Sequence, residues 1–299
     1  MAQQLCAAAE SPVTERTYSP LVALQTGTPA HTPVFCIPGA GANVGSFVAL
    51  AAALGKETPV YGLQPRGLDG VAVPYASVET AARDYVKAIR QLYPDGRVNL
   101  LGHSFGGWVA CEIARQLHAA GCGRPALVLV DSLPPGGAAA AAEYTHAMVL
   151  RDMAAVLQEA AAQPLDLALD ELQQASEAEQ YALLHRAMVA AGLMPERSLP
   201  NALRGPLRSF ARCLRTAYTP EGQYPGPLLL VQAAGSAAAA GEEARRAQEQ
   251  AWRNYAPRLQ AWCAPGNHMT VLGEAHAAAL AARLRAEWEV AAKTALAAQ

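Results

Sequence analysis

The chain has 299 residues, of which 52% are apolar and 16% are charged, and its formal net charge at pH 7 is −2. This near-neutral charge disfavours nucleic acid or an anionic membrane surface as a partner, and no apolar run approaches the ~20 residues of a membrane span. The first residues have neither the basic region nor the apolar core of a signal peptide. We therefore expect a cytoplasmic globular protein, built as one large α/β domain or two small ones.

The six cysteines are scattered along the chain and form no C-x-x-C pair. This spacing favours free thiols in a reducing compartment over a disulfide framework or a zinc site. The sequence also contains no dinucleotide-binding loop. We expect no permanently bound metal or cofactor.

In the first half of the chain, short apolar runs alternate with segments of helical periodicity. We interpret residues 1–17, which are alanine-rich and then polar, as a linker or a frayed terminus. Strands that alternate with helices at this spacing indicate βαβ units and a mostly parallel sheet flanked by helices. The predicted strands are 20–24, 33–37, 59–63, 98–101 and 126–130, and the predicted helices are 44–54, 77–93 and 108 to about 121.

The pattern changes after the Pro-Pro-Gly-Gly stretch that ends at Gly137. Residues 138 to about 205 contain alanine-rich helical stretches and no strand candidate. We interpret 136–205 as a helical lid inserted over the sheet, although a helix face lined by Met or Leu is more often ordinary packing. The core then comprises 18–135 and 206–299, with further strands at 227–232 and 259–264 and further helices at 242–252 and 271–297.

The sequence Gly102-His103-Ser104-Phe105-Gly106 lies between a predicted buried strand and a predicted helix. A nucleophile elbow requires this G-x-S-x-G context, because its glycines let the backbone turn sharply. Ser104 would then stand at the amino terminus of the helix, where partial positive charge collects. The pattern also arises by chance in a chain with 24 glycines, so the hypothesis depends on a histidine and an acid elsewhere.

Among the seven histidines, His268 follows the last predicted strand, at the sheet edge where Ser104 is also expected. We interpret the other six, including His103, as surface or packing residues. Asp131 ends the strand after the elbow helix, whereas the loop after the penultimate strand has no carboxylate before Glu242. An aspartate at a strand end also serves as a turn cap. As the catalytic acid, Asp131 would orient His268 and stabilise the imidazolium that forms when Ser104 loses its proton.

A tetrahedral intermediate on Ser104 needs hydrogen-bond donors for its oxyanion. The backbone N–H of Phe105, directly after the nucleophile, is the first expected donor. The second is expected in the loop after the strand 33–37, where Gly39 or Ala40 could supply it. The predicted chemistry is therefore acyl transfer through a seryl ester.

Five segments carry the most specific patterns: F-C-I-P-G-A-G-A-N (35–43), V-Y-G-L-Q-P-R-G-L-D-G (60–70), L-L-G-H-S-F-G-G-W-V-A (100–110), L-V-L-V-D-S (127–132) and P-G-N-H-M-T-V-L (265–272). Together they resemble the thioesterase domains of nonribosomal peptide and polyketide synthetases, which have the α/β-hydrolase fold. The resemblance runs from about Tyr18 to Ala282 and is weakest across the insertion. The second segment is the most specific and favours chain-terminating, type I domains over stand-alone, type II editing enzymes.

The resemblance implies a helical lid and a substrate that arrives on the phosphopantetheine arm of an acyl or peptidyl carrier protein. It also implies release of the acyl chain by hydrolysis or macrocyclisation. By motif position it carries the catalytic roles to Ser104, Asp131 and His268, with Phe105 and Gly39 at the oxyanion positions. The chain departs from the family where it has Gly-Asn-His instead of the common Gly-Asp-His, which alters the surroundings of the base.

Three alternatives remain at this level. A type II thioesterase would clear misprimed carriers and prefer short acyl groups, and a generic serine carboxylesterase or lipase would need no carrier. A catalytically silent binding module would usually have lost a member of the triad. The D-S-L sequence at Ser132 matches a carrier-protein attachment motif, but it follows a buried strand instead of starting a helix, so we reject it as a phosphopantetheine site.

Overall fold

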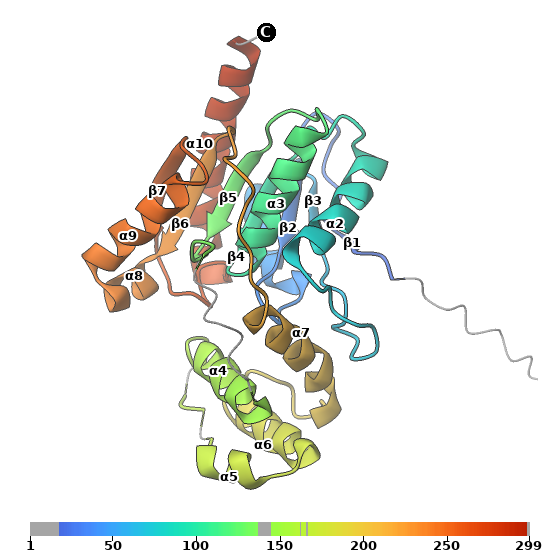
Figure 1. Cartoon of the computed structure of the whole chain (residues 1–299), viewed down its shortest axis with the longest axis vertical. Helices are drawn as coiled ribbons and strands as arrows, with labels where there is room; N and C mark the ends of the chain where they lie inside the picture. The colour runs from blue at the N-terminus through green and yellow to red at the C-terminus, as the bar shows by residue number, and fades with distance from the viewer. Residues whose placement is uncertain (1–17, 137–144, 162, 166, 298–299) are drawn as a thin grey trace, which may run out of the picture.

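The computed structural model describes residues 18–136, 145–161, 163–165 and 167–297. Its centre is a single seven-stranded sheet in the order β1-β3-β2-β4-β5-β6-β7, covered by helices on both faces (Figure 1). The predicted linker, 1–17, lies outside the described residues. The strands are β1 (Leu21–Gln25), β2 (Val34–Ile37), β3 (Val60–Leu63), β4 (Asn99–His103), β5 (Ala126–Val130), β6 (Leu228–Ala233) and β7 (Leu259–Ala264).

Only β1, at one edge, runs antiparallel to its neighbour, and the other five pairings are parallel. Every residue of β2, β4, β5 and β6 is buried, as expected where helices cover both faces of a parallel sheet. This arrangement confirms the predicted fold class. The carboxyl ends of β4, β5 and β7 lie toward one edge of the sheet, which is the edge that carries the predicted site.

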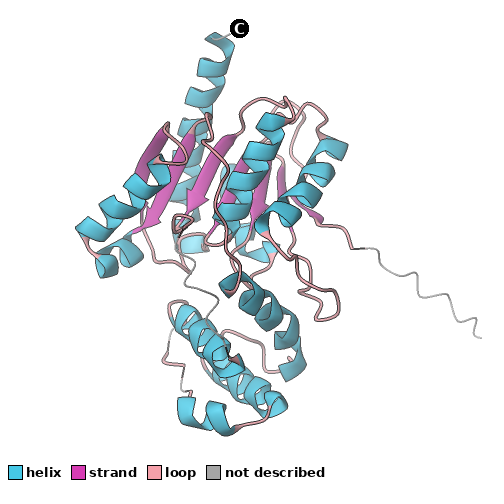
Figure 2. Cartoon of the chain, in the orientation of Figure 1, coloured by secondary structure: helices cyan, strands magenta, loops and turns pink. Residues whose placement is uncertain are grey.

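Two groups of helices cover the sheet (Figure 2). The apolar residues of α2 and α3 pack with one face, where Tyr85 and Ile113 are buried. The apolar residues of α1 and α10 pack with the other face, where Leu50 and Leu284 are buried. The helices of the core are α1 (Val48–Leu54), α2 (Val78–Leu92), α3 (Gly106–Ala119), α8 (Ala234–Ala240), α9 (Glu242–Arg253) and α10 (Glu274–Ala297).

The remaining helices form a separate layer beyond the carboxyl edge of the sheet (Figure 1). They enclose a small apolar core of their own, in which Leu150, Leu184 and Leu207 are buried. We call this layer the lid; its helices are α4 (His146–Gln158), α5 (Leu169–Gln174), α6 (Glu177–Ala190) and α7 (Arg204–Leu214).

Two segments differ from the sequence-based expectation. The predicted lid boundary at 205 falls inside α7, whose Leu207 and Phe210 are buried in the lid core. The helix continues across Pro206 because a proline is tolerated in the first turn, where its missing N–H needs no acceptor. The alanine-rich stretch 233–241, which the sequence places in the loop after the penultimate strand, contains α8.

Candidate active site

Ser104 lies at the turn between β4 and α3. Its φ is +52°, a left-handed conformation that costs a residue other than glycine about 1–3 kcal/mol. The turn is closely packed: a Cβ at Gly102 would lie 2.3 Å from the carbonyl oxygen of Gly106, and a Cβ at Gly106 would lie 2.3 Å from that of Ile37. Glycine is therefore required at both positions, as the elbow hypothesis predicts.

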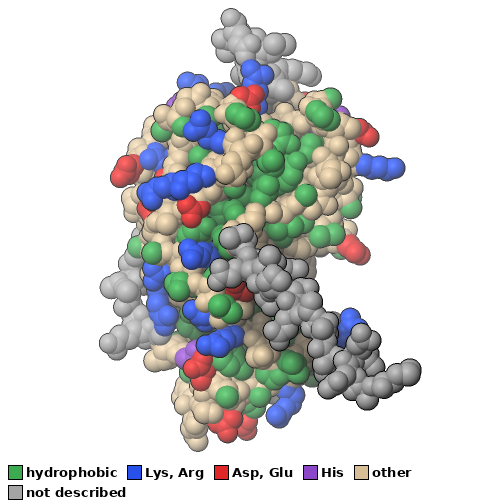
Figure 3. Space-filling view, turned by 90° about the vertical axis from the view of Figure 1, so that its right-hand side faces the viewer, with side chains coloured by type: hydrophobic (Ala, Val, Ile, Leu, Met, Phe, Trp, Pro, Cys, Tyr) green, Lys and Arg blue, Asp and Glu red, His purple; other side chains and the backbone are tan. Residues whose placement is uncertain are grey.

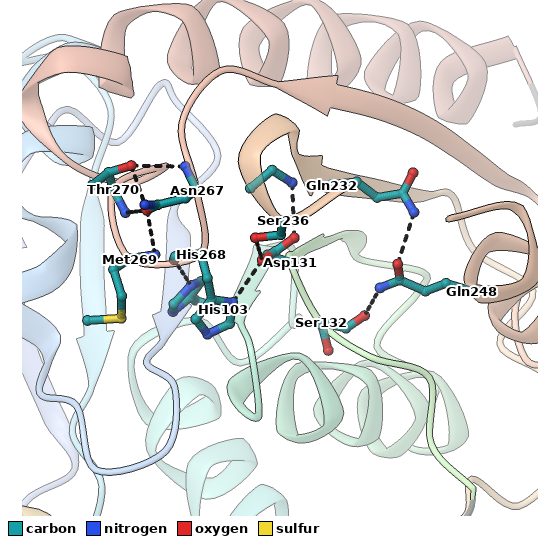
Figure 4. Close-up of polar contacts among 11 residues, drawn as sticks. His103, Asp131, Ser132, Gln232, Ser236, Gln248, Asn267, His268, Met269 and Thr270 are labelled. Carbon is teal, nitrogen blue, oxygen red and sulfur yellow. Dashed lines mark hydrogen bonds and ion pairs between the residues drawn. The ribbon is translucent and has the colours of Figure 1, made fainter. Parts of the chain in front are cut away.

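Asp131, directly after β5, is the second strained residue, with φ +45°. Its Oδ2 accepts hydrogen bonds from His268 Nδ1 at 2.8 Å and from Ser236 Oγ at 3.0 Å, and its Oδ1 accepts one from the Ala233 N–H at 3.0 Å (Figure 4). Burial acts to raise the pKa of Asp131, but these three hydrogen bonds outweigh it and lower the pKa below its ordinary value. The carboxylate is thus held ionised beside His268.

The structure brings the predicted acid and base together from strands that are not neighbours, since β6 lies between β5 and β7. Asp131 accepts from Nδ1 of His268, so the bond selects the tautomer with the proton on Nδ1 and leaves Nε2 as the proton acceptor. No hydrogen bond joins the Ser104 hydroxyl to His268 among the described residues. Catalytic bonds of this kind often form only when substrate is bound.

Asn267 organises the turn that carries His268. Its Oδ1 accepts hydrogen bonds from the backbone N–H groups of Met269 at 3.1 Å and Thr270 at 2.9 Å (Figure 4). Its Nδ2 donates to the carbonyl oxygen of Glu159, at the end of α4, at 2.9 Å. The asparagine therefore links the turn of the base to the lid, which an aspartate could not do because it lacks the amide donor.

Replacing Asn267 with Asp is expected to release this contact while keeping the turn. The carboxylate retains the acceptor oxygen used by Met269 and Thr270, but its second oxygen would face the Glu159 carbonyl. We expect amide hydrogen exchange in the last turn of α4 to become about fivefold to tenfold faster, as for the loss of roughly one hydrogen bond. Unchanged exchange in α4 would contradict the link, and exchange in α2 provides the internal control.

His103 is a residue whose role sequence analysis missed. It is buried, with 7% of its surface exposed, and its Nε2 donates to the carbonyl oxygen of His268 at 2.9 Å (Figure 4). The centres of the two rings lie 4.7 Å apart. Burial, reinforced by the neighbouring His268, lowers the pKa of His103 to about 4. His103 is thus a neutral, buried support for the backbone of the predicted base.

The titration of His103 predicts an acid-sensitive stability. Its pKa is about 4 in the folded protein, against 6.5 for an unperturbed histidine. The unfolded chain therefore binds more protons between these values, and the free energy of unfolding falls as the pH decreases from about 6.5 toward 4, by up to about 3 kcal/mol. In a His103→Gln variant the amide replaces the ring N–H as donor but does not titrate. The free energy of unfolding, measured by urea denaturation, should therefore fall less steeply with decreasing pH than in the wild type. Equal pH slopes for both proteins would contradict this assignment.

The predicted oxyanion donors also meet at the elbow. A Cβ built on Gly39 would lie 3.1 Å from the Cβ of Ser104, so the loop after β2 packs directly against the nucleophile. The backbone N–H groups of Phe105, Gly39 and Ala40 donate no hydrogen bond to any described residue. Gly39 and Phe105 line one small pocket, together with Ile37 and Val109.

Comparison with known proteins identifies the family. The sequence profile of the thioesterase domain matches residues 32–287. The chain belongs to the thioesterase domain family. A chondramide synthase of Chondromyces crocatus is 29% identical over 269 residues, which are 85% of this chain but 6% of that protein. A malpibaldin synthetase of Mortierella alpina is 40% identical over 115 residues, 38% of this chain and 2% of that protein.

Solved structures agree with the thioesterase fold. A four-domain nonribosomal peptide synthetase superposes with a TM-score of 0.77 at 22% identity, over 92% of this chain and 20% of that one. The Vlm2 thioesterase domain, bound with a dodecadepsipeptide, superposes with a TM-score of 0.60 at 25% identity, over 89% of this chain and 96% of that one. The thioesterase domain described here therefore has the length of a single domain within such synthetases, spanning only 2–6% of the first two curated relatives.

No helix among the described residues of this thioesterase domain is long and apolar enough to cross a membrane. Five of its six cysteines lie in the described part of the chain, and all five are free thiols. The sixth, Cys6, lies outside it.

Proposed function

We propose that this thioesterase domain releases an acyl, peptidyl or polyketidyl chain from the phosphopantetheine arm of a carrier protein through a seryl ester. The observation that carries the proposal is the 2.8 Å hydrogen bond between Asp131 and His268. It lies at the same edge of the sheet as the elbow that holds Ser104 in a strained backbone conformation. The relatives, which are named as synthetases and synthases, support a carrier-bound substrate. The free thiols support a cytoplasmic location.

The chemistry follows from the positions of the three side chains. His268 Nε2 takes the proton of the Ser104 hydroxyl while Ser104 Oγ attacks the thioester carbonyl. Asp131 stabilises the resulting imidazolium. The Phe105 N–H, with that of Gly39 or Ala40, binds the oxyanion of the tetrahedral intermediate. Collapse of the intermediate expels the pantetheine thiolate, which takes the proton from His268 to become the thiol, and leaves the seryl ester.

A second nucleophile then completes release. In hydrolysis, water gives its proton to His268 and attacks the ester, and in macrocyclisation a hydroxyl or amine of the acyl chain does so. The bond between the acyl carbon and Ser104 Oγ then breaks, and His268 returns the proton to that oxygen. A type II editing thioesterase would use the same steps on short acyl groups. A generic carboxylesterase would use them on simple esters, and the length preference for carrier-bound thioesters distinguishes these three.

Intact-protein mass spectrometry tests the proposal. The protein is incubated with pantetheine thioesters of increasing acyl length and with p-nitrophenyl esters of the same acyl groups. We expect a mass gain equal to the acyl group with the thioesters, on the peptide that contains Ser104, and preference for long chains. A product lighter by one water than the free acid identifies cyclisation. Reaction with p-nitrophenyl esters alone would support the carboxylesterase, and no adduct even from acylated carrier protein would overturn the proposal.

A further inference from the structure

The small pocket beside the elbow, which we call the elbow pocket, lies between the core and the lid. Gly39 and Phe105 line it from the core together with Ile37 and Val109, and α7 lines it from the lid. Its volume is about 60 Å³, which exceeds the roughly 10–15 Å³ that one water molecule needs. Because Gly39 packs against Ser104, an acyl group on that serine would enter this pocket.

Helix α7 is held against the core over the elbow pocket. Lys and Arg side chains gather along the junction of lid and core (Figure 3). Two arginines of α7 donate to carbonyl oxygens of the loop between β3 and α2: Arg208 to Gly70 at 2.6 Å, and Arg212 to Ala76 at 2.7 Å. Contacts with the core therefore set the position of the α7 side chains relative to the elbow.

One face of α7 is directed toward the elbow pocket. Ser209, Arg212 and Cys213 line the pocket, and positions i, i+3 and i+4 share one face of a helix. Leu207 and Phe210 of the same helix are buried in the lid core instead. The face toward the pocket therefore brings hydrogen-bonding groups to a predominantly apolar space, whereas the face toward the lid core is apolar.

Ser209 is the residue of this face whose hydrogen-bonding capacity is unused. Arg212 donates to two backbone carbonyls, and the Thr216 hydroxyl, beyond the end of α7, donates to the carbonyl of Arg212 at 2.8 Å. Ser209 is 4% exposed, and its Oγ is buried without a hydrogen-bond partner among the described residues. A serine inside a helix ordinarily bonds to the carbonyl four residues earlier or faces solvent, and Ser209 does neither.

Other hydroxyl groups of the lining are already engaged. Ser77 accepts from the Thr80 N–H at 3.2 Å, and Tyr85 donates to the Gln64 carbonyl at 3.4 Å. Among the lining residues, all of which belong to the described part of the chain, Ser209 alone has a buried side-chain oxygen or nitrogen with no partner. A buried polar group without a partner is unfavourable, so a ligand that supplies one is preferred.

We propose that Ser209 is a specificity-determining residue, whose hydroxyl hydrogen-bonds an oxygen on the acyl chain of the substrate. The substrate class is then an acyl chain with a keto, hydroxyl or amide oxygen at a defined distance from the thioester, in preference to a saturated chain. An oxygen at another position along the chain would be buried against apolar side chains without a partner. This inference rests on the proposed function, because it takes the ligand to be a thioester substrate.

The test moves one oxygen along a chain of constant length. Titration calorimetry measures the binding of S-octanoyl-pantetheine and of its 3-, 4-, 5- and 6-oxo derivatives to the Ser104→Ala protein, which leaves the thioesters intact. The four oxo compounds have the same composition, so differences among them report the position of the oxygen. We expect one of them to bind at least about tenfold more tightly than the other three.

Adding Ser209→Ala should bring the four oxo compounds to within about twofold of one another. Binding of the octanoyl compound should stay within about twofold, because alanine removes only the unpaired hydroxyl and favours the helix. Ser132→Ala is the matched control, since it also removes a buried hydroxyl without a partner among the described residues but lies outside the pocket lining. It should preserve the preference among the oxo compounds.

Two results would overturn the inference while leaving the proposed function in place. These are equal affinities of the four oxo compounds in the parent, and a positional preference that survives Ser209→Ala. A merely structural role of Ser209 gives the second result, because it weakens all the ligands alike and leaves their ratios unchanged. Undetectable binding of all five ligands would also overturn the inference. The formation of the seryl ester is tested separately, since no readout here depends on acyl transfer.

Discussion

Replacing Ser104 with alanine is expected to lower kcat for thioester turnover by about 10⁴- to 10⁶-fold. The variant removes the side-chain hydroxyl at the tip of the elbow, and alanine tolerates the +52° φ about as poorly as serine does. Stability should therefore change little while the acyl-enzyme disappears. Steady-state thiol release and the intact mass after substrate addition give the two measurements.

Ser132→Ala is the matched control for this experiment. Ser132 is fully buried two residues from the carboxyl end of β5, and its hydroxyl has no hydrogen-bond partner among the described residues. Removing a buried unpaired hydroxyl is neutral or slightly stabilising, so the kcat should stay within about twofold of wild type. A Ser104→Ala protein that retains the adduct would contradict the assignment of the nucleophile.

Replacing Asp131 with asparagine is expected to lower kcat by about 10³- to 10⁴-fold. The side chain keeps its size, but it can present its amide N–H toward His268 Nδ1 and thereby favour the tautomer with the proton on Nε2. His268 then cannot accept the Ser104 proton. The variant also loses the negative charge that stabilises the imidazolium.

The effect should be separable from simple loss of a hydrogen bond. Ser236→Ala removes one of the three donors to Asp131 and leaves the other two, so we expect only a severalfold decrease in kcat. With the carboxylate less well stabilised, the pKa of Asp131 should rise, and activity should be lost at a higher pH than in the wild type as the medium is acidified. An Asp131→Asn protein with nearly wild-type kcat would show that another group orients His268.

Local sequence patterns predicted most strands and helices of this thioesterase domain. The strand 259–264 coincides with β7. The predicted helix 77–93 corresponds to α2, and the Ser77 hydroxyl directly before it accepts a hydrogen bond from the Thr80 N–H. Burial on both faces makes β2, β4, β5 and β6 continuous apolar runs. Such runs can be recognised as strands from the local sequence alone. The predicted lid boundary at 205 falls inside α7, because the lid core that holds Leu207 and Phe210 is assembled from segments far apart in sequence.

The candidate site shows the same division. Chain order and strand ends were enough to propose Ser104, Asp131 and His268, because parallel strands direct their carboxyl ends to one edge. The sequence indicates His103 only as a surface or packing residue, because its hydrogen bond to the His268 carbonyl joins residues 165 positions apart. The same holds for Ser236, because the sequence indicates only a loop for its segment, which forms α8 beside Asp131.

The sequence by itself determined the alternation of strands and helices, the glycine-lined elbow and the residue types that acyl transfer requires, because each depends on neighbours within a few positions. Only the tertiary structure decided the strand order that sets Asp131 against His268 and the hydrogen bond from Asn267 to the lid. These features depend on side chains that meet across more than 100 residues of chain or across separate packing layers. The periodicity of a sequence does not predict contacts between residues so far apart in the chain.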